Sequence, residues 1–235
     1  MAAPLTVAMA ERVERSRGPK AGYVVWKGLA DVSTSSAVRG PALLGALRCA
    51  IQLADVNVVF DLATAWRTSR VTGPAPELFE HCRALAREGH APAARALAEA
   101  EVARRPSARA LYLHARLLER AGDVAAALSR YAEAARAGEE ERAPSLVRAS
   151  RVRRLALAWR ARVPVADLVE EAGVVDLGGA SEPERLVVAR MLLRSPSRYL
   201  RAGDRPRSRR AGRRGRRHAR HTRPAHARRA PGHRR

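Results

Sequence analysis

Aromatic residues are scarce in this sequence, at 4% of 235 residues, and only two cysteines are present. Ala, Arg and Leu dominate instead, and runs of β-branched residues are short. Because Ala and unbranched side chains favour helix over strand, this composition predicts helices that pack through small side chains. Cys49 and Cys82 stand in unrelated local contexts, so we expect two reduced thiols rather than a disulfide framework or a metal site.

Long apolar runs are also missing. No window approaches the roughly 18 apolar residues that a membrane-spanning helix needs. The first residues turn charged after a short apolar stretch and lack the order of a secretory signal peptide. We therefore expect a soluble, cytoplasmic protein with no membrane contact. Residues 1–20 are predicted to be disordered or frayed, and residues 21–203 to form the helical domain.

The residue patterns that indicate an enzyme or a metal centre are not found. The stretch "RGPALLG" (39–45) contains glycines but no following Lys-Ser or Lys-Thr, so it is not a phosphate-binding loop. Residues 33–36 are polar but lack the Gly-x-Ser-x-Gly frame of a nucleophile. His81 and His114 make an incomplete metal site by themselves. We predict a non-enzymatic protein with no cofactor and no catalytic or metal-binding residues.

A two-helix pattern occurs twice, 33 residues apart. Residues 78–106 and 110–138 each place apolar or small residues at helical spacing, followed by a glycine and an Ala-rich stretch. Gly89 and Gly122 stand at equivalent places, where a residue free to adopt positive φ ends the first helix. Pro92 falls in the first turn of a second helix, where its missing N–H has no partner within the helix. The pattern predicts two helical hairpins.

This pattern resembles the tetratricopeptide repeat (TPR), a unit of two helices with a period near 34 residues. In the second copy the matching residues are Leu111, Ala115, Leu118, Gly122, Asp123, Ala127, Tyr131 and Ala134. In the first copy they are Leu78, Cys82, Leu85, Gly89, Ala94 and Pro106. The resemblance implies an all-α fold in which antiparallel hairpins stack as a short TPR-like solenoid. Its best repeats are residues 75–107 and 108–140.

Further helices are expected on both sides of the two repeats, because a repeat buries its apolar face only against a neighbour. Residues 41–70 contain two apolar segments around Asp55 and are interpreted as a degenerate helical hairpin. Three downstream segments are amphipathic helix candidates, namely residues 145–162, 165–173 and 182–195.

The resemblance also implies a binding surface. In this family the first helices of successive repeats line a concave groove, and residues four apart on a helix share a face. The groove positions have the order aromatic, Arg, Arg in both copies, and they are Phe79, Arg83, Arg87, Tyr112, Arg116 and Arg120. Arg binds carboxylates through two parallel hydrogen bonds, and an aromatic ring adds apolar area. We expect a scaffold that binds an acidic peptide or helix there. Alternatively, these arginines form a solvated face and the two aromatic rings pack between helices.

The C-terminal segment differs in composition from the rest. Residues 204–235 contain 14 Arg and one Asp, which is +13 of the total net charge of +22, and no Val, Ile, Leu, Met or aromatic residue. A segment without apolar side chains cannot offset its ordering entropy, so disorder is predicted. An Arg-rich disordered tail binds phosphate without sequence preference. The alternative function is therefore nucleic-acid association, through Arg209, Arg210, Arg213, Arg214, Arg216 and Arg217.

A second explanation of this tail stays open. It uses only Arg, Ala, Gly, Pro, His, Ser, Thr and Asp, which are the residue types that GC-rich DNA encodes when it is read out of frame. On this interpretation the reading frame shifts near residue 204. The authentic chain then continues as further helical array.

Overall fold

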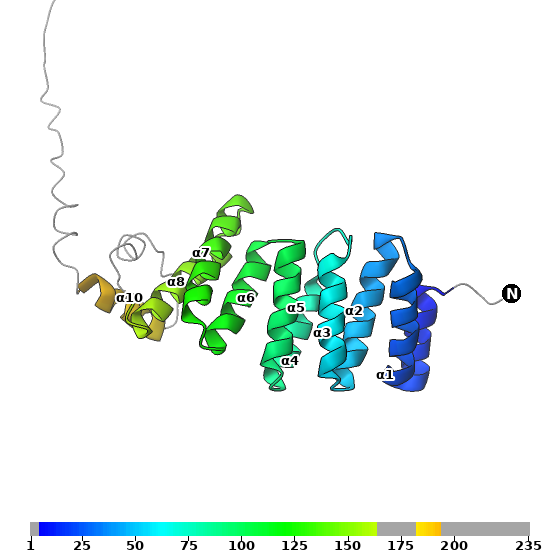
Figure 1. Ribbon diagram of the computed structural model, residues 1–235. Helices are drawn as coiled ribbons and strands as arrows, with labels where there is room; N and C mark the ends of the chain where they lie inside the picture. Colours follow the sequence, from blue (N-terminus) through cyan, green and yellow to red (C-terminus); the bar gives the residue numbers. More distant parts are fainter. Residues whose placement is uncertain (1–4, 164–181, 194–235) are drawn as a thin grey trace, which may run out of the picture. The chain divides into compact units, whose positions relative to one another are not determined.

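The computed structural model describes residues 5–163 and 182–193, which belong to a compact unit spanning residues 1–196. These residues form helices and no strands, in agreement with the predicted all-α class. The helices in chain order are α1 (Val7–Val32), α2 (Ser36–Gln52), α3 (Val56–Thr68), α4 (Pro76–Arg87), α5 (Ala91–Arg104), α6 (Ala108–Arg120), α7 (Val124–Glu140), α8 (Pro144–Arg160) and α10 (Glu182–Leu193) (Figure 1).

The helices α2 to α6 alternate between two layers, and α8 extends the first layer. In one layer α2 contacts α4, α4 contacts α6 and α6 contacts α8, while α3 packs against α5 in the other layer. The pairs α2–α3, α4–α5 and α6–α7 pack as hairpins, and α1 packs along α2 (Figure 1). The prediction of stacked helix pairs is confirmed, and it places α4 and α6, the two helices with the predicted groove residues, in the same layer.

The turns of the two predicted hairpins form where the sequence indicated. Gly89 lies between α4 and α5 with φ of 91°, and Gly122 lies between α6 and α7 with φ of 80°. Pro92 is in the first turn of α5. Ser107 and Asp123 cap α6 and α7, each accepting a hydrogen bond from a backbone N–H of the first turn. Local residue chemistry thus defines both hairpins.

The prediction of a frayed N-terminus over residues 1–20 is wrong from residue 7 onward, because α1 begins there. Thr6 caps the helix by accepting a hydrogen bond from the Met9 backbone, and Ala10 is fully buried. The helix kinks at Gly18, whose φ is 80°, and continues from Pro19. Part of the charge of this segment is bound by residues far along the chain, because Glu14 accepts hydrogen bonds from Trp26 and Arg48.

The predicted flanking helices form as well. Residues 41–70 fold as α2 and α3 around Asp55, which caps α3 by accepting a hydrogen bond of 3.2 Å from the Val58 backbone. The segment 145–162 corresponds to α8, and α10 covers most of 182–195. The candidate helix 165–173 and the tail 204–235, with all six of its candidate arginines, lie outside the described residues.

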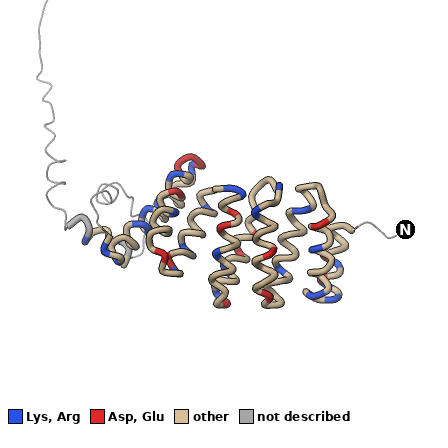
Figure 2. The backbone as a smooth tube through the Cα atoms, in the orientation of Figure 1, with Lys and Arg blue, Asp and Glu red and all other residues tan. Residues whose placement is uncertain are grey.

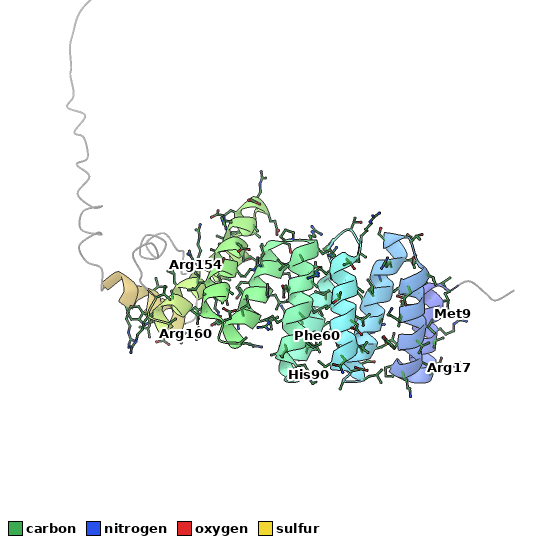
Figure 3. The ribbon with its side chains drawn as sticks, in the orientation of Figure 1. Met9, Arg17, Phe60, His90, Arg154 and Arg160 are labelled. Atoms are coloured by element: carbon green, nitrogen blue, oxygen red, sulfur yellow. The ribbon has the colours of Figure 1, made fainter. Side chains whose placement is uncertain are left out.

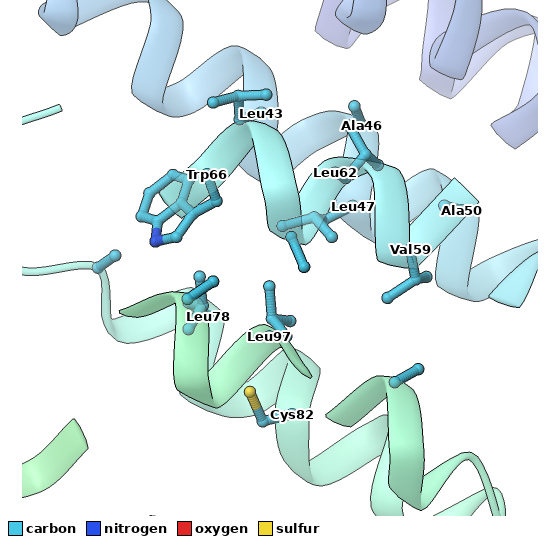
Figure 4. Close-up of a cluster of buried hydrophobic side chains, with 14 of the residues drawn as sticks. Leu43, Ala46, Leu47, Ala50, Val59, Leu62, Trp66, Leu78, Cys82 and Leu97 are labelled. Atoms are coloured by element: carbon cyan, nitrogen blue, oxygen red, sulfur yellow. The ribbon is translucent and has the colours of Figure 1, made fainter. Parts of the chain in front are cut away.

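The core between the layers is built mainly from aliphatic side chains and alanines, together with Trp26 and Trp66. Leu47, Leu62, Leu78 and Leu97 converge from four helices and are fully buried (Figure 4). Both cysteines are free and buried, as expected. Burial raises the pKa of the Cys49 thiol to about 12 and also raises that of Cys82, so both stay protonated at neutral pH. Among the described helices, none combines the length and apolar character needed to span a bilayer.

Candidate functional site

All six residues predicted for the groove line one cavity. This cavity has a volume of about 580 Å³, lies between α4 and α6, and reaches Leu146 of α8. Phe79, Arg83 and Arg87 follow one another at four-residue spacing along α4, and Tyr112, Arg116 and Arg120 do so along α6. Residues at this spacing share a helix face. The structure therefore brings the two predicted rows to the same hollow, which we call the arginine cavity.

Positive charge distinguishes the arginine cavity. Lys and Arg occur on all the described helices, whereas acidic residues gather at places such as the end of α7 (Figure 2). A basic residue alone therefore marks no site on this protein. The cavity wall, however, contains five arginines and one carboxylate, namely Arg83, Arg87, Arg109, Arg116, Arg120 and Glu80. Arg109 was not predicted, although it lies on the same helix three residues before Tyr112.

The carboxylates near these arginines neutralise them only in part. Arg83 pairs with Glu80 at 2.9 Å, and both side chains are more than half exposed, so this ion pair is weak. Arg116 lies 4.0 Å from Glu119 and 3.5 Å from the Tyr112 hydroxyl oxygen. Because the wall retains more arginines than carboxylates, the electrostatic potential in the cavity is positive.

The two aromatic residues of the rows occupy different environments. Phe79 is only 6% exposed, and the Arg109 guanidinium lies over its ring, 4.7 Å from the centroid. Phe79 thus supports the cavity wall and positions a cation. Tyr112 is half-buried, packs at 5.8 Å between ring centroids against Tyr131, and lies beside Arg116. Tyr112 is therefore the aromatic side chain that a ligand can contact.

A carboxylate whose side chain is 11% exposed holds the α6 side of the cavity in place. Glu119 accepts hydrogen bonds from the Tyr131 hydroxyl of α7, at 2.5 Å, and from Arg160 of α8, labelled in Figure 3. Burial alone would raise the pKa of Glu119, but these hydrogen bonds and the charge of Arg160 outweigh it and lower the pKa. The carboxylate stays ionised at neutral pH and ties three helices together.

The same kind of cluster occurs twice more. Near the N-terminus, Glu14 accepts a hydrogen bond of 2.7 Å from the Trp26 indole and two from Arg48, at 2.8 and 2.6 Å. In the middle of the chain, Glu101 accepts hydrogen bonds in the same way from the Trp66 indole and from Arg104. These clusters were not predicted. The sequence contained one sign of them, a spacing of 12 residues between carboxylate and aromatic residue. This spacing separates Glu14 from Trp26 and Glu119 from Tyr131.

The two histidines considered for a metal site have different neighbours. His81 of α4 lies near Arg48, whereas His114 of α6 is 4% exposed and lies near Arg130. Burial lowers the pKa of each ring, and the nearby arginine lowers it further. In residues 5–163 and 182–193 no three His, Cys, Asp or Glu side chains gather as metal ligands.

The described chain is therefore an all-α protein of stacked helix pairs with an arginine-lined cavity in one layer. Comparisons with models of known protein families, with curated proteins and with solved structures find no match to it.

Proposed function

We propose that this protein is a non-enzymatic scaffold that binds an acidic peptide or helix in the arginine cavity. The observation that carries this proposal is the lining of the cavity, where five arginines from two helices face a single carboxylate. A guanidinium group bound to a carboxylate forms charge-assisted hydrogen bonds, each contributing about 1.5–3 kcal/mol. The half-buried Tyr112 adds apolar contact area beside them.

The resemblance to the TPR family supports the same proposal. The two hairpins have positive-φ glycines at equivalent turns, and the first helices of both hairpins lie in one layer with α2 and α8. A TPR-like array binds its partner along such a layer. The long arginine side chains make recognition electrostatic, so binding should weaken as salt concentration rises.

The test is binding of a fluorescent peptide of alternating Glu and Ala, measured by anisotropy. Changing Arg83 and Arg116 together to Glu should abolish binding, because two attractive charges become repulsive within one cavity. The matched control changes Arg67 and Arg136 to Glu, which are exposed on α3 and α7 outside the cavity. It alters net charge equally and should retain most of the binding. Equal loss in both variants would show that only overall charge matters.

The alternative function, nucleic-acid association through the tail, is favoured by its composition of 14 arginines in residues 204–235. Binding by such a tail releases counterions and falls steeply with salt. Replacing Arg209, Arg210, Arg213, Arg214, Arg216 and Arg217 by Gln in the full chain should then abolish salt-sensitive binding to a DNA duplex. The Arg83→Glu/Arg116→Glu variant should keep most of it. The opposite pattern would assign phosphate binding to the helical domain.

A further inference from the structure

A second cavity, of about 600 Å³, lies beside the arginine cavity in the same layer. It is bordered by α1, α2, α4 and the segment before α4, and Glu80 of α4 lines both cavities. Much of its wall is apolar and comes from Val7, Ala37, Pro41, Leu44, Val71 and Ala75. Most of its charged lining residues are negative, whereas most of those in the arginine cavity are positive. We call it the acidic cavity because Glu11, Glu77 and Glu80 are in its lining.

Three exposed carboxylates line the acidic cavity, Glu11 from α1 and Glu77 and Glu80 from α4. Glu80 is shared with Arg83, whereas no ion pair within the described part of the chain involves Glu11 or Glu77. The cation in this lining, Arg48, is already bound by Glu14 through two hydrogen bonds of 2.8 and 2.6 Å. The negative charge of this cavity is therefore largely uncompensated.

His81 also lines this cavity and adds no positive charge to it at neutral pH. Burial, followed by the charge of Arg48, lowers the pKa of His81, so the ring is neutral at pH 7. The Nε2 atom has no partner in the structure. Because this atom is covered by protein atoms, the acceptors that the cavity offers to a ligand are its carboxylates.

These groups suit a cationic side chain. The methylene stem of a lysine or arginine packs on an apolar wall, and its charged end requires acceptors, which the three carboxylates supply. An acidic side chain would be repelled here, and a purely apolar one would leave the carboxylates without a partner. The two neighbouring cavities therefore have opposite preferences.

Resting on the proposed function above, we infer that one peptide occupies both cavities, with an acidic segment in the arginine cavity and a lysine or arginine in the acidic cavity. Neighbouring packed helices lie about 10 Å apart, so the two cavities are about that distance from each other. An extended chain covers it in about three residues. The partner is then a peptide with a basic residue about three positions from an acidic cluster, and the paired charges determine the direction in which it binds.

The test uses the full chain and four fluorescent peptides with the same Glu cluster. Two carry Arg three positions before or after the cluster, and two carry Gln at these positions. We expect one Arg peptide to bind about tenfold more tightly than its Gln counterpart, as an added charge-assisted contact would give. Changing Glu11 and Glu77 to Gln should remove that gain and leave the affinity of the Gln peptides unchanged.

The control variant changes Asp61 and Glu140, exposed carboxylates on α3 and α7, to Asn and Gln. It should keep the tenfold preference, and circular dichroism should show the same helix content for all variants. If the Gln peptides bind but Arg brings no gain, or if the gain survives in the Glu11→Gln/Glu77→Gln variant, the acidic cavity does not bind the cation. If the Gln peptides do not bind at all, the proposed function of the arginine cavity fails instead.

Discussion

The indole nitrogen of Trp66 donates a hydrogen bond of 2.7 Å to the carboxylate of Glu101, which lies 35 residues further along the chain and is 2% exposed. Arg104 binds the same carboxylate at 2.8 and 2.7 Å, lies 4.8 Å from the centre of the Trp66 ring, and also donates to the backbone oxygen of Val71. This cluster joins α3, α5 and the segment that leads into α4. It therefore ties the first predicted repeat to the hairpin that precedes it.

Removing this carboxylate should destabilise the fold strongly. In Glu101→Leu, the buried Arg104 guanidinium loses its counter-charge, and the loss of a partner from a buried pair costs about 3–5 kcal/mol. Urea unfolding measured by circular dichroism gives the change in the free energy of unfolding. The control, Glu140→Leu, alters an exposed glutamate at the end of α7 and should change stability by less than about 1 kcal/mol. Similar values for both variants would show that the cluster contributes little.

Gly45 allows α2 to approach the Trp26 ring of α1. A Cβ atom at this position would lie 2.4, 2.5 and 2.9 Å from ring atoms of Trp26. Gly45→Ala should therefore cost about 1–3 kcal/mol, the usual range for overpacking a core. Gly28 of α1 is the matched control, because its added Cβ would meet only Leu5, at 4.0 Å. Gly28→Ala should be neutral or stabilise the protein by up to about 1 kcal/mol. Thermal melting of both variants tests this. The prediction is wrong if Gly45→Ala melts no lower than the wild type.

Burial of His114 makes stability depend on pH. Burial, followed by the charge of Arg130, lowers the pKa of this ring from its ordinary value of 6.5, and its Nδ1 atom is buried without a partner. Between the lowered pKa and 6.5, the unfolded chain binds more protons than the folded one. Stability contributed by the neutral ring is therefore complete above pH 6.5 and is lost as the pH falls below it.

His114→Leu should reduce that dependence. The free energy of unfolding, measured by urea at several pH values from about 7 to about 5, should fall less steeply for this variant than for the wild type. Leu also removes an unpaired buried nitrogen, so stability at pH 7 should not decrease by more than about 1 kcal/mol. A slope equal to that of the wild type would mean that His114 takes up no proton on unfolding.

Much of the secondary structure could be predicted because its causes are local. The helix-ending glycines at 89 and 122, the first-turn Pro92 and the cap Asp55 act within a few residues of their own position. The rows at four-residue spacing on α4 and α6 follow from helix geometry alone, which is why the sequence placed their six residues on common faces.

The N-terminal helix shows where such reasoning fails. Thr6 is a local capping signal that the prediction for residues 1–20 did not take into account. The decisive contacts of this segment are distant, since Glu14 binds Trp26 and Arg48, 12 and 34 residues away. Burial of a charge depends on which partner the fold brings to it, and no local pattern contains that information.

The sequence by itself determined the all-α class, the two hairpin turns and the faces on which the groove residues lie, since each depends on backbone preferences and helix periodicity. Only the tertiary structure decided that Phe79 is buried beneath Arg109 while Tyr112 stays accessible. It also placed a cavity of opposite charge beside the arginine cavity, with Glu80 in both. The reason is physical: exposure and the neutralisation of a charge depend on side chains from other helices, which meet only when the layers pack.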